Sequence, residues 1–441
     1  MDDTIFALAS ATGRAGIAVV RVSGPLAGPV LLAMGRRAQL PAPRRMTRVD
    51  LVRPDDAAVL DRALAAWFPG PRSFTGEDVL ELHLHGGRAV LAAVVDVLAG
   101  WPGLRAAEPG EFTRRAFEHG KLDLTEAEGL ADLVNAETEG QRRQALRQFD
   151  GGLSRLYEAW RGSLIHALAH LEADIDFPDE DLPEGTGDAV RPEIDRLLAE
   201  VRAHLQDDRR GERLREGLSV VIVGPPNVGK SSLLNILARR DAAIVAATAG
   251  TTRDVIEVHM DLGGFPVVVA DTAGLRDATD PVEAEGIRRA RRRAEDADLR
   301  IVMADARDWP ELPPESQALL GPDTMVVVNK VDLRTSPLVS GSGALGISAT
   351  TGEGVEALVT ALAQAVRLRM DLSSSPVLTR ARHRAALMDC SAALERYLEG
   401  ETSELKAEDI RLAARALGRI TGRVDVEDIL DVVFRDFCIG K

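Results

Sequence analysis

The chain has 441 residues, 45% of them hydrophobic, and carries a formal net charge of -15. This length predicts about two or three domains, and the acidic balance argues against a general polyanion-binding surface, which would need many Lys and Arg contacts. Two cysteines are too few for a disulfide framework. No apolar run is long enough to span a membrane and no signal-like segment opens the chain, so we expect a cytoplasmic protein without a membrane partner.

Residues 1–120 have a mixed pattern that predicts an α+β domain. The run GIAVVRVSG (16–24) is rich in β-branched residues, and DVLELHLHGG (78–87) alternates before a glycine pair. Both patterns are typical of strands. His83 and His85 alternate along the second run and so face one side, but no further ligands lie nearby in the sequence, which favours packing over zinc.

Helical patterns dominate residues 121–217. Thr125 and Glu128 have the spacing of a capping box, and apolar residues then recur at helical spacing as far as Trp160. The acidic stretch DIDFPDEDLPEG (174–185) lacks the spacing and the glycine of a calcium loop, which favours a solvated connector. A further helix is expected near 189–207.

Short apolar runs alternate with helical patterns across 218–376. The runs are LSVVIVG, FPVVVAD, LRIVMAD, TMVVVNK and ALGISA. Each run but the last is a near-continuous apolar block, which is typical of a parallel sheet covered on both faces, so this segment is predicted to be a doubly wound α/β domain. Residues 377–441 are helical again, with Cys390 at an apolar position typical of a core. We expect 121–217 and 377–441 to form one discontinuous helical domain into which the α/β domain is inserted.

The sharpest motif is GPPNVGKS (224–231), which follows a predicted strand and opens a helix. It matches the phosphate-binding pattern G-x-x-x-x-G-K-S. Gly224 and Gly229 let backbone N–H groups surround phosphates, Lys230 neutralises the β- and γ-phosphates, and Ser231 is a Mg²⁺ ligand. A nucleotide site is therefore predicted here.

Four further motifs follow in the order typical of a GTPase: AGTTRD (249–254), DTAG (271–274), NKVD (329–332) and SA (348–349). Thr252 and Asp271 are expected at Mg²⁺, and the Gly274 N–H at the γ-phosphate. Asn329 and Asp332 match the hydrogen-bonding edge of guanine and not that of adenine. The sequence therefore predicts binding and hydrolysis of GTP.

The position after DTAG departs from GTPases of the Ras type. It holds Leu275, where those enzymes place the glutamine that orients the attacking water. Water must then be positioned in another way. Asn227, inside the phosphate-binding loop, has an oxygen that either holds a monovalent cation or only stabilises the loop, and the residues alone favour neither hypothesis.

Three more segments carry a family resemblance: FTGEDVLELHLHGG (74–87), PGEFTRRAF…KLDL (109–124) and FCIGK (437–441). With the GTPase motifs, they make almost the whole chain similar to the bacterial tRNA-modification GTPases of the MnmE (TrmE) family. The resemblance implies a tetrahydrofolate-binding-like dimerisation domain (1–120), a helical domain in two parts (121–217 and 377–441) and a Ras-like G domain (218–376).

The resemblance also implies the roles of individual residues. GTP hydrolysis would use Mg²⁺ and be stimulated by K⁺ through dimerisation of G domains, with Lys230, Gly274 and Glu283 in catalysis and Glu283 acting through water. The Mg²⁺ ligands would include Ser231 and Thr252, and the K⁺ ligands would be Asn227, Ala246, Thr248 and Thr251. The nucleotide would be bound by Asn227, Val228, Gly229, Lys230, Ser231, Ser232, Ala246, Ala247, Thr248, Ala249, Gly250, Thr251, Thr252, Asp271, Thr272, Ala273, Gly274, Asn329, Lys330, Asp332, Ser348 and Ala349.

Finally, the resemblance implies a reaction and its partners. A homodimer would act with the flavin-dependent MnmG (GidA), in a heterotetramer or larger complex, to add a carboxymethylaminomethyl group to C5 of the wobble uridine of certain tRNAs. A reduced folate, such as 5-formyltetrahydrofolate, would supply the one-carbon unit at Arg21, Glu81, Lys121 and Lys441, with Cys438 a candidate functional thiol. The alternative hypothesis is a GTPase switch in ribosome assembly, but such proteins often end in an RNA-binding module, whereas this chain ends in helical patterns.

Overall fold

The computed structural model describes residues 3–176, 190–207, 209–240, 242–244, 257–271, 292–334, 343–370 and 377–424, together with 430, 433, 434, 437 and 440. The chain divides into two compact units. Unit 1 contains 1–131, 148–172 and 410–441, and unit 2 contains 132–147 and 173–409. Within the described residues, none of the helices has the length and apolar character needed to cross a membrane.

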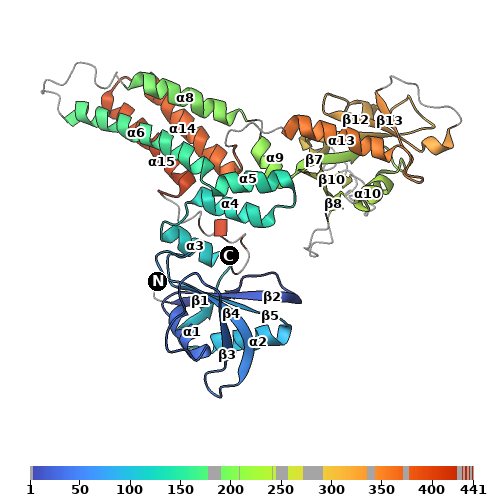
Figure 1. The fold of residues 1–441 in the computed structure, drawn as a ribbon. Helices are drawn as coiled ribbons and strands as arrows, with labels where there is room; N and C mark the ends of the chain where they lie inside the picture. Colours follow the sequence, from blue (N-terminus) through green and yellow to red (C-terminus); the bar gives the residue numbers. More distant parts are fainter. Residues whose placement is uncertain are drawn as a thin grey trace, which may run out of the picture. The chain divides into compact units, whose positions relative to one another are not determined.

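Unit 1 contains a six-stranded sheet in the order β3-β4-β5-β2-β1-β6 (Figure 1). Its strands are β1 (Thr4–Leu8), β2 (Ala15–Ser23), β3 (Thr47–Val52), β4 (Val59–Phe68), β5 (Val79–Gly86) and β6 (Leu104–Ala106). All neighbours are antiparallel except β1 and β6, which are parallel. The α+β prediction for this part of the chain is confirmed.

Helices α1 (Ala27–Met34) and α2 (Arg88–Ala99) cover one face of this sheet. Val20 and Leu82 are among the strand residues buried beneath them. Because side chains alternate along a strand, Arg21 and Glu81 lie on the opposite face. The binary pattern of β2 and β5 therefore determines which face carries the polar groups.

The helical segment after residue 110 forms several helices, α3 (Glu111–Glu118), α4 (Leu124–Asn135), α5 (Glu139–Phe149) and α6 (Gly152–Asp176). The capping box predicted at Thr125 and Glu128 is wrong by two positions. Instead, the Asp123 N–H donates to Glu126 Oε2 and the Glu126 N–H donates to Asp123 Oδ1, both at 2.9 Å. Helix α4 begins earlier because Leu124 is fully buried against Phe434 and Phe437, which places Thr125 inside the helix.

Helices from both sides of the predicted G domain pack together within each unit. In unit 1, Thr421 at the end of α15 (Ser403–Thr421) donates to Glu158 on α6 at 2.9 Å. In unit 2, α14 (Ala381–Glu399) packs against α8 (Arg191–Leu205). Cys390 of α14 is fully buried, and this burial, with the charge of Asp389, raises the pKa of its thiol to about 12. It is an unreactive core residue, as predicted.

Unit 2 contains a seven-stranded sheet in the order β13-β12-β11-β7-β10-β9-β8. The strands are β7 (Leu218–Val223), β8 (Ala243–Ile244), β9 (Glu257–Leu262), β10 (Phe265–Asp271), β11 (Leu299–Asp305), β12 (Thr324–Asn329) and β13 (Ala344–Gly346). The helical elements described around it are α9 (Arg210–Glu216), α10 (Lys230–Ala238), α12 (Pro314–Gln317), η2 (Val331–Leu333) and α13 (Val355–Met370). The five predicted apolar runs are confirmed as parallel neighbours.

Two strands of this sheet were not predicted. β9 pairs antiparallel with β10, and β8 pairs antiparallel with β9. The sequence signal was present: polar and apolar residues alternate in EVHMDL (257–262), and in the structure the apolar ones are buried. Gly263 and Gly264 follow and make the turn with positive φ. Because β9 has no continuous apolar run, it escaped the criterion that found the buried strands.

Candidate active site

The phosphate-binding loop joins β7 to α10. Gly224 and Gly229 have φ of +151° and +103°. A Cβ on Gly229 would lie 2.2 Å from the side-chain nitrogen of Asn329, and one on Gly224 would lie 2.6 Å from the Met303 carbonyl oxygen. These glycines are therefore required for close packing as well as for exposing backbone N–H groups.

Lys230 and Ser231 open α10 beside the end of β10. The Lys230 ammonium donates to the carbonyl oxygens of Gly224 and Pro225, each at 2.9 Å. The Ser231 hydroxyl donates to Asp271 Oδ2 at 2.6 Å. Hydroxyl and carboxylate oxygens are the hard ligands that Mg²⁺ prefers, so Ser231 and the buried Asp271 fit the predicted metal. When bound, Mg²⁺ would neutralise phosphate charge here.

The NKVD loop follows β12 and is tied to its neighbours through Asn329. Its side-chain nitrogen donates to the Val228 carbonyl oxygen at 2.8 Å, and its side-chain oxygen accepts from the Ala349 N–H at 2.9 Å. Asn329 is only 2% exposed. It therefore joins the phosphate-binding loop to the SA turn. The carboxylate of Asp332 is exposed and is suited to accept the two N–H groups of a guanine edge.

Several predicted site residues lie outside the described residues. They are Ala246, Ala247, Thr248, Ala249, Gly250, Thr251, Thr252, Thr272, Ala273, Gly274, Glu283, Cys438 and Lys441. Asp305 was not singled out in the sequence; it ends β11 and accepts a hydrogen bond from Lys330 of the NKVD loop at 2.7 Å. An acidic residue that ends an apolar strand was a sequence signal that could have identified it. Among the residues that are described, no group of three or more His, Cys, Asp or Glu side chains is arranged to hold a metal.

A second polar site lies on the sheet of unit 1. Arg21 on β2 and Glu81 on β5 are directly opposite in register, and Arg21 Nη2 and Nε donate to Glu81 Oε1 at 2.9 and 3.1 Å. Arg21 Nη1 also donates to the Gly440 carbonyl oxygen at 3.3 Å. The guanidinium carbon lies 5.6 Å from the ring centres of both Phe74 and Phe112. Segments far apart in the sequence thus meet at one arginine.

The other two residues predicted for this site differ in how the structure places them. The Lys121 ammonium donates to the Pro71 carbonyl oxygen at 2.8 Å, so its hydrogen-bond partner lies in the loop before Phe74. Lys441 is outside the described residues. His83 Nε2 lies 3.5 Å from Glu81 Oε2 without a hydrogen bond, whereas His85 Nδ1 is hydrogen-bonded to Asp61 Oδ1 at 2.7 Å.

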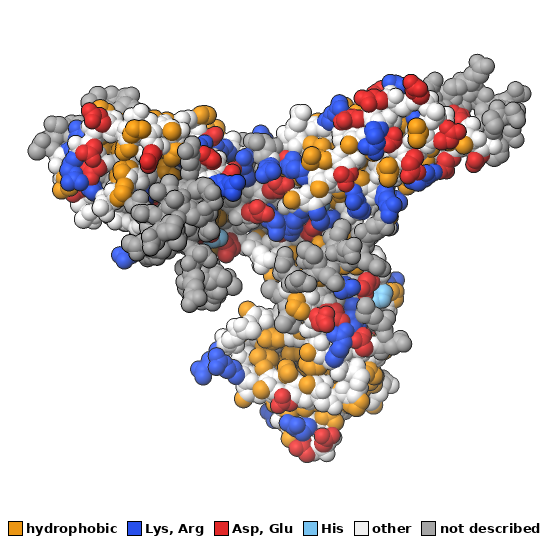
Figure 2. Space-filling model, turned by 180° about the vertical axis from the view of Figure 1, so that it is seen from behind, with side chains coloured by type: hydrophobic (Ala, Val, Ile, Leu, Met, Phe, Trp, Pro, Cys, Tyr) orange, Lys and Arg blue, Asp and Glu red, His pale blue; other side chains and the backbone are white. Residues whose placement is uncertain are grey.

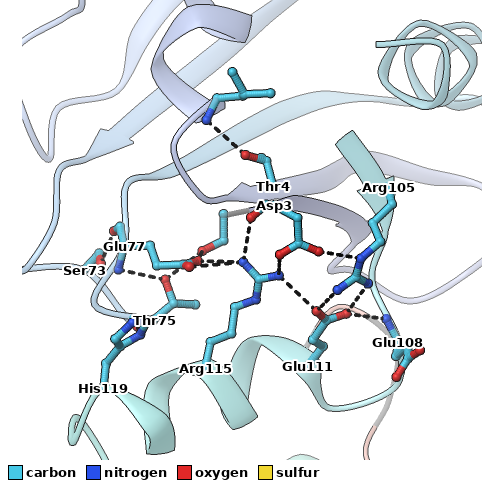
Figure 3. Close-up of polar contacts among 12 residues, drawn as sticks. Asp3, Thr4, Ser73, Thr75, Glu77, Arg105, Glu108, Glu111, Arg115 and His119 are labelled. Atoms are coloured by element: carbon cyan, nitrogen blue, oxygen red, sulfur yellow. Dashed lines mark hydrogen bonds and ion pairs between the residues drawn. The ribbon is translucent and has the colours of Figure 1, made fainter. Parts of the chain in front are cut away.

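A buried ion network joins the loop that carries Phe74 to helix α3, which carries Phe112 (Figure 3). Arg115 of α3 is 1% exposed and binds Glu77, Glu111 and Asp3 at 2.9–3.1 Å. Burial alone would raise the pKa of Glu111, but hydrogen bonds, first among them that from Arg105, outweigh burial and hold this pKa below its ordinary value. The network fixes the FTGED loop to α3.

The mostly parallel sheet, the phosphate-binding loop and the NKVD loop define the class of protein as a P-loop enzyme that hydrolyses GTP. Comparisons with known proteins then show its family. The model described as GTP-binding protein TrmE N-terminus matches residues 4–121, and the model described as MnmE helical domain matches residues 124–438. The chain belongs to the MnmE family of tRNA modification GTPases.

Curated relatives match the chain over its full length. The tRNA modification GTPases MnmE of Parvibaculum lavamentivorans and Paramagnetospirillum magneticum are 59% and 58% identical, with 100% of each chain covered. That of Methylobacterium radiotolerans is 52% identical over 100% of this chain and 99% of the relative. This similarity favours tRNA modification over the ribosome-assembly hypothesis.

Solved structures resemble part of the chain. A variant of Aquifex aeolicus Era bound to GDP.AlF4- is 22% identical, with 42% of this chain and 68% of Era covered and a TM-score of 0.26. The FeoB G domain of Methanococcus jannaschii is 23% identical, with 34% of this chain and 98% of that domain covered and a TM-score of 0.26. At these TM-scores the two likenesses carry no argument.

Proposed function

We propose that this GTPase acts with the flavin-dependent MnmG on tRNA, where the complex adds a carboxymethylaminomethyl group to C5 of the wobble uridine. One observation carries the proposal. Three segments that support the family resemblance each contribute a contact to Arg21: Phe74 and Glu81 from 74–87, Phe112 from 109–124, and Gly440 from 437–441. Their convergence defines a site separate in kind from the nucleotide site.

A reduced folate, such as 5-formyltetrahydrofolate, is the ligand we propose for this second site. Glu81 can accept from the N–H groups of a pterin edge, and a guanidinium is suited to a carboxylate. Phe74 and Phe112 supply aromatic surface beside Arg21. When bound, the folate would supply a one-carbon unit. Lys121, Lys441 and Cys438 remain proposed members of the site.

Arg21→Ala is expected to weaken binding of 5-formyltetrahydrofolate by at least tenfold, because a charge-assisted hydrogen bond of about 1.5 kcal/mol or more would be lost. Titration calorimetry on the full chain measures this. Arg48→Ala is the matched control, since Arg48 is a largely exposed arginine of the same sheet. Equal folate affinity in both variants and the wild type would show that Arg21 does not bind the folate. GTP hydrolysis should be unchanged in both.

We propose a homodimer formed through the amino-terminal domain. Ile17 on β2 is 63% exposed and Leu64 on β4 is 44% exposed. By strand register both lie on the same face as Arg21 and Glu81. Figure 2 shows hydrophobic side chains gathered on the surface of this domain. A second copy that covered this face would bury them and enclose the polar site.

At the nucleotide site we propose that K⁺ supports hydrolysis in place of the missing glutamine. Asn227 has φ of +57° within the phosphate-binding loop and belongs to the proposed K⁺ ligands, with Thr251 and the backbone at Ala246 and Thr248. G domains of two subunits would approach each other in this state. Glu283 would orient water, while Lys230 and the Gly274 N–H would bind the γ-phosphate.

The K⁺ proposal predicts a salt-specific rate. GTP turnover by the wild type should be at least about tenfold faster in KCl than in NaCl at equal ionic strength. The proposed ligands fit K⁺, and a K⁺ ion held there would stabilise the negative charge that develops on the phosphates in the transition state. Asn227→Ala should lose this difference while still binding GTP. Phosphate release in the two salts is the measurement, and equal wild-type rates would contradict the proposal.

A further inference from the structure

Asp305 is a buried carboxylate beside the nucleotide loops. It ends β11, lies opposite Asn329 in the register of β11 and β12, and is 7% exposed. Its Oδ2 accepts from the Lys330 ammonium at 2.7 Å. Arg307 binds the same carboxylate through Nε at 3.0 Å and Nη2 at 2.6 Å, and the Arg307 N–H donates to Oδ1 at 3.0 Å.

Lys330 has a second partner in the phosphate-binding loop. Its ammonium donates to the Asn227 carbonyl oxygen at 2.8 Å, while the neighbouring Asn329 donates to the Val228 carbonyl oxygen at 2.8 Å. Two consecutive residues of the NKVD loop are therefore tied to two consecutive carbonyls of the phosphate-binding loop. A lysine ammonium is a compact charge on a flexible stem, so a neutral carbonyl alone would hold it weakly.

We propose that Asp305 is a positioning residue of the guanine-nucleotide site, which holds Lys330 against the Asn227 carbonyl and so clamps the NKVD loop to the phosphate-binding loop. The proposal rests on GTP binding by this fold and on no assumption about folate, K⁺ or partners. The clamp stabilises bound nucleotide equally in the ground state and in the transition state. Its loss should therefore raise Kd and KM and leave kcat unchanged.

The carboxylate of Asp305 stays charged across the working range of the enzyme. Hydrogen bonds from Arg307 are the largest influence on Asp305 and hold its pKa far below the ordinary value. Burial acts in the opposite direction, and a further hydrogen bond from Lys330 adds to the lowering. The carboxylate side of the clamp is therefore charged from about pH 5 upwards. Nucleotide affinity should show no titration of Asp305 in this range.

The test compares Asp305→Ala, Asp305→Asn and Arg307→Ala in the full-length protein. Stopped-flow fluorescence of a labelled GDP gives Kd and the dissociation rate, and phosphate release gives KM and kcat. Asp305→Ala should raise Kd, KM and the dissociation rate about tenfold, equal to roughly 1.4 kcal/mol. Asp305→Asn should have a smaller effect because its amide oxygen still accepts from Lys330. Arg307→Ala, which leaves the clamp in place, should change each value less than about threefold.

A merely structural role would give a different pattern. A fall in kcat with KM unchanged, or a lower Tm with an unchanged dissociation rate, would overturn the proposal. If Asp305→Ala fails to fold, Asp305→Asn is combined with Lys330→Met. The substitution at Asp305 should then have little additional effect on nucleotide affinity, because its partner is already gone. Additive losses in the double variant would show that Asp305 does not act through Lys330.

Discussion

Lys230→Ala is expected to lower kcat/KM for GTP by at least about a hundredfold, the scale of losing one preorganised electrostatic contact to the reacting group. Lys230 is mostly buried and its ammonium is already held at the Gly224 and Pro225 carbonyls of the phosphate-binding loop. These carbonyls hold the ammonium within the loop that the motif assigns to the phosphates. The variant should lose both affinity and rate, because phosphate charge is present in the ground state and in the transition state.

Phosphate release at varied GTP concentration measures this effect. Arg239→Ala is the matched control, because Arg239 is an exposed cation at the other end of α10. It should leave kcat/KM within about twofold, since an exposed surface charge contributes little. A Lys230→Ala enzyme with more than about a third of wild-type activity would show that the loop does not bind the reacting phosphates.

The second large effect is expected in unit 1. Arg115→Ala should lower the free energy of opening the amino-terminal domain by about 3–5 kcal/mol, because Glu77 would lose the cation that binds it and Glu111 and Asp3 would keep only their bonds to Arg105. Arg115 is 1% exposed and contacts Glu77, Glu111 and Asp3 (Figure 3). Hydrogen exchange read by mass spectrometry over residues 74–87 and 105–118 measures the opening locally, without assuming two-state unfolding of the whole chain.

Arg114→Ala is the control for this prediction. Arg114 is the sequence neighbour of Arg115, but its side chain is 36% exposed and pairs with Glu118 one helical turn away. Its loss should cost less than about 1 kcal/mol. Similar exchange in the two variants would show that burial of the network does not stabilise the domain.

The pH dependence of the Arg115→Ala effect has a definite sign. The pKa values of Glu111 and Asp3 are lowered in the folded protein, where hydrogen bonds and charges from Arg105 and Arg115 outweigh burial. A carboxyl group whose pKa is lowered by folding stabilises the folded protein at pH values above its pKa in the unfolded chain. This stabilisation is lost as the pH falls through its pKa in the folded protein. The difference between wild type and variant should therefore shrink below about pH 4.

The sequence predicted those parts of the fold that depend on local pattern. The five parallel strands and the phosphate-binding loop were predicted because apolar runs and glycine spacing are read within a few residues. The capping box was wrong because Asp123 and Thr125 are both good N-caps, and burial of Leu124, a tertiary effect, decides between them. β9 was missed because an alternating strand gives a weaker signal than a continuous one.

Contacts between distant residues could not be predicted from pattern alone. The bond between Arg21 and the Gly440 carbonyl joins residues 419 positions apart. Arg115 has three carboxylate partners: Glu77 in the loop before β5, Glu111 on α3 and Asp3 near the start of the chain. Composition and periodicity carry no information about contacts between residues so far apart in the sequence. Asp305 was missed for the same reason, since its partner Lys330 follows β12, the next strand of the sheet.

The central claim is that GTP hydrolysis at Lys230 supports modification of the wobble uridine. Nucleoside mass spectrometry of bulk tRNA tests it most directly, in a strain that lacks the chain and is complemented with either wild type or Lys230→Ala. We predict that wild type restores the carboxymethylaminomethyl group at C5 of uridine and that Lys230→Ala does not. Normally modified tRNA in the uncomplemented strain, with abnormal ribosomal subunits, would contradict the account.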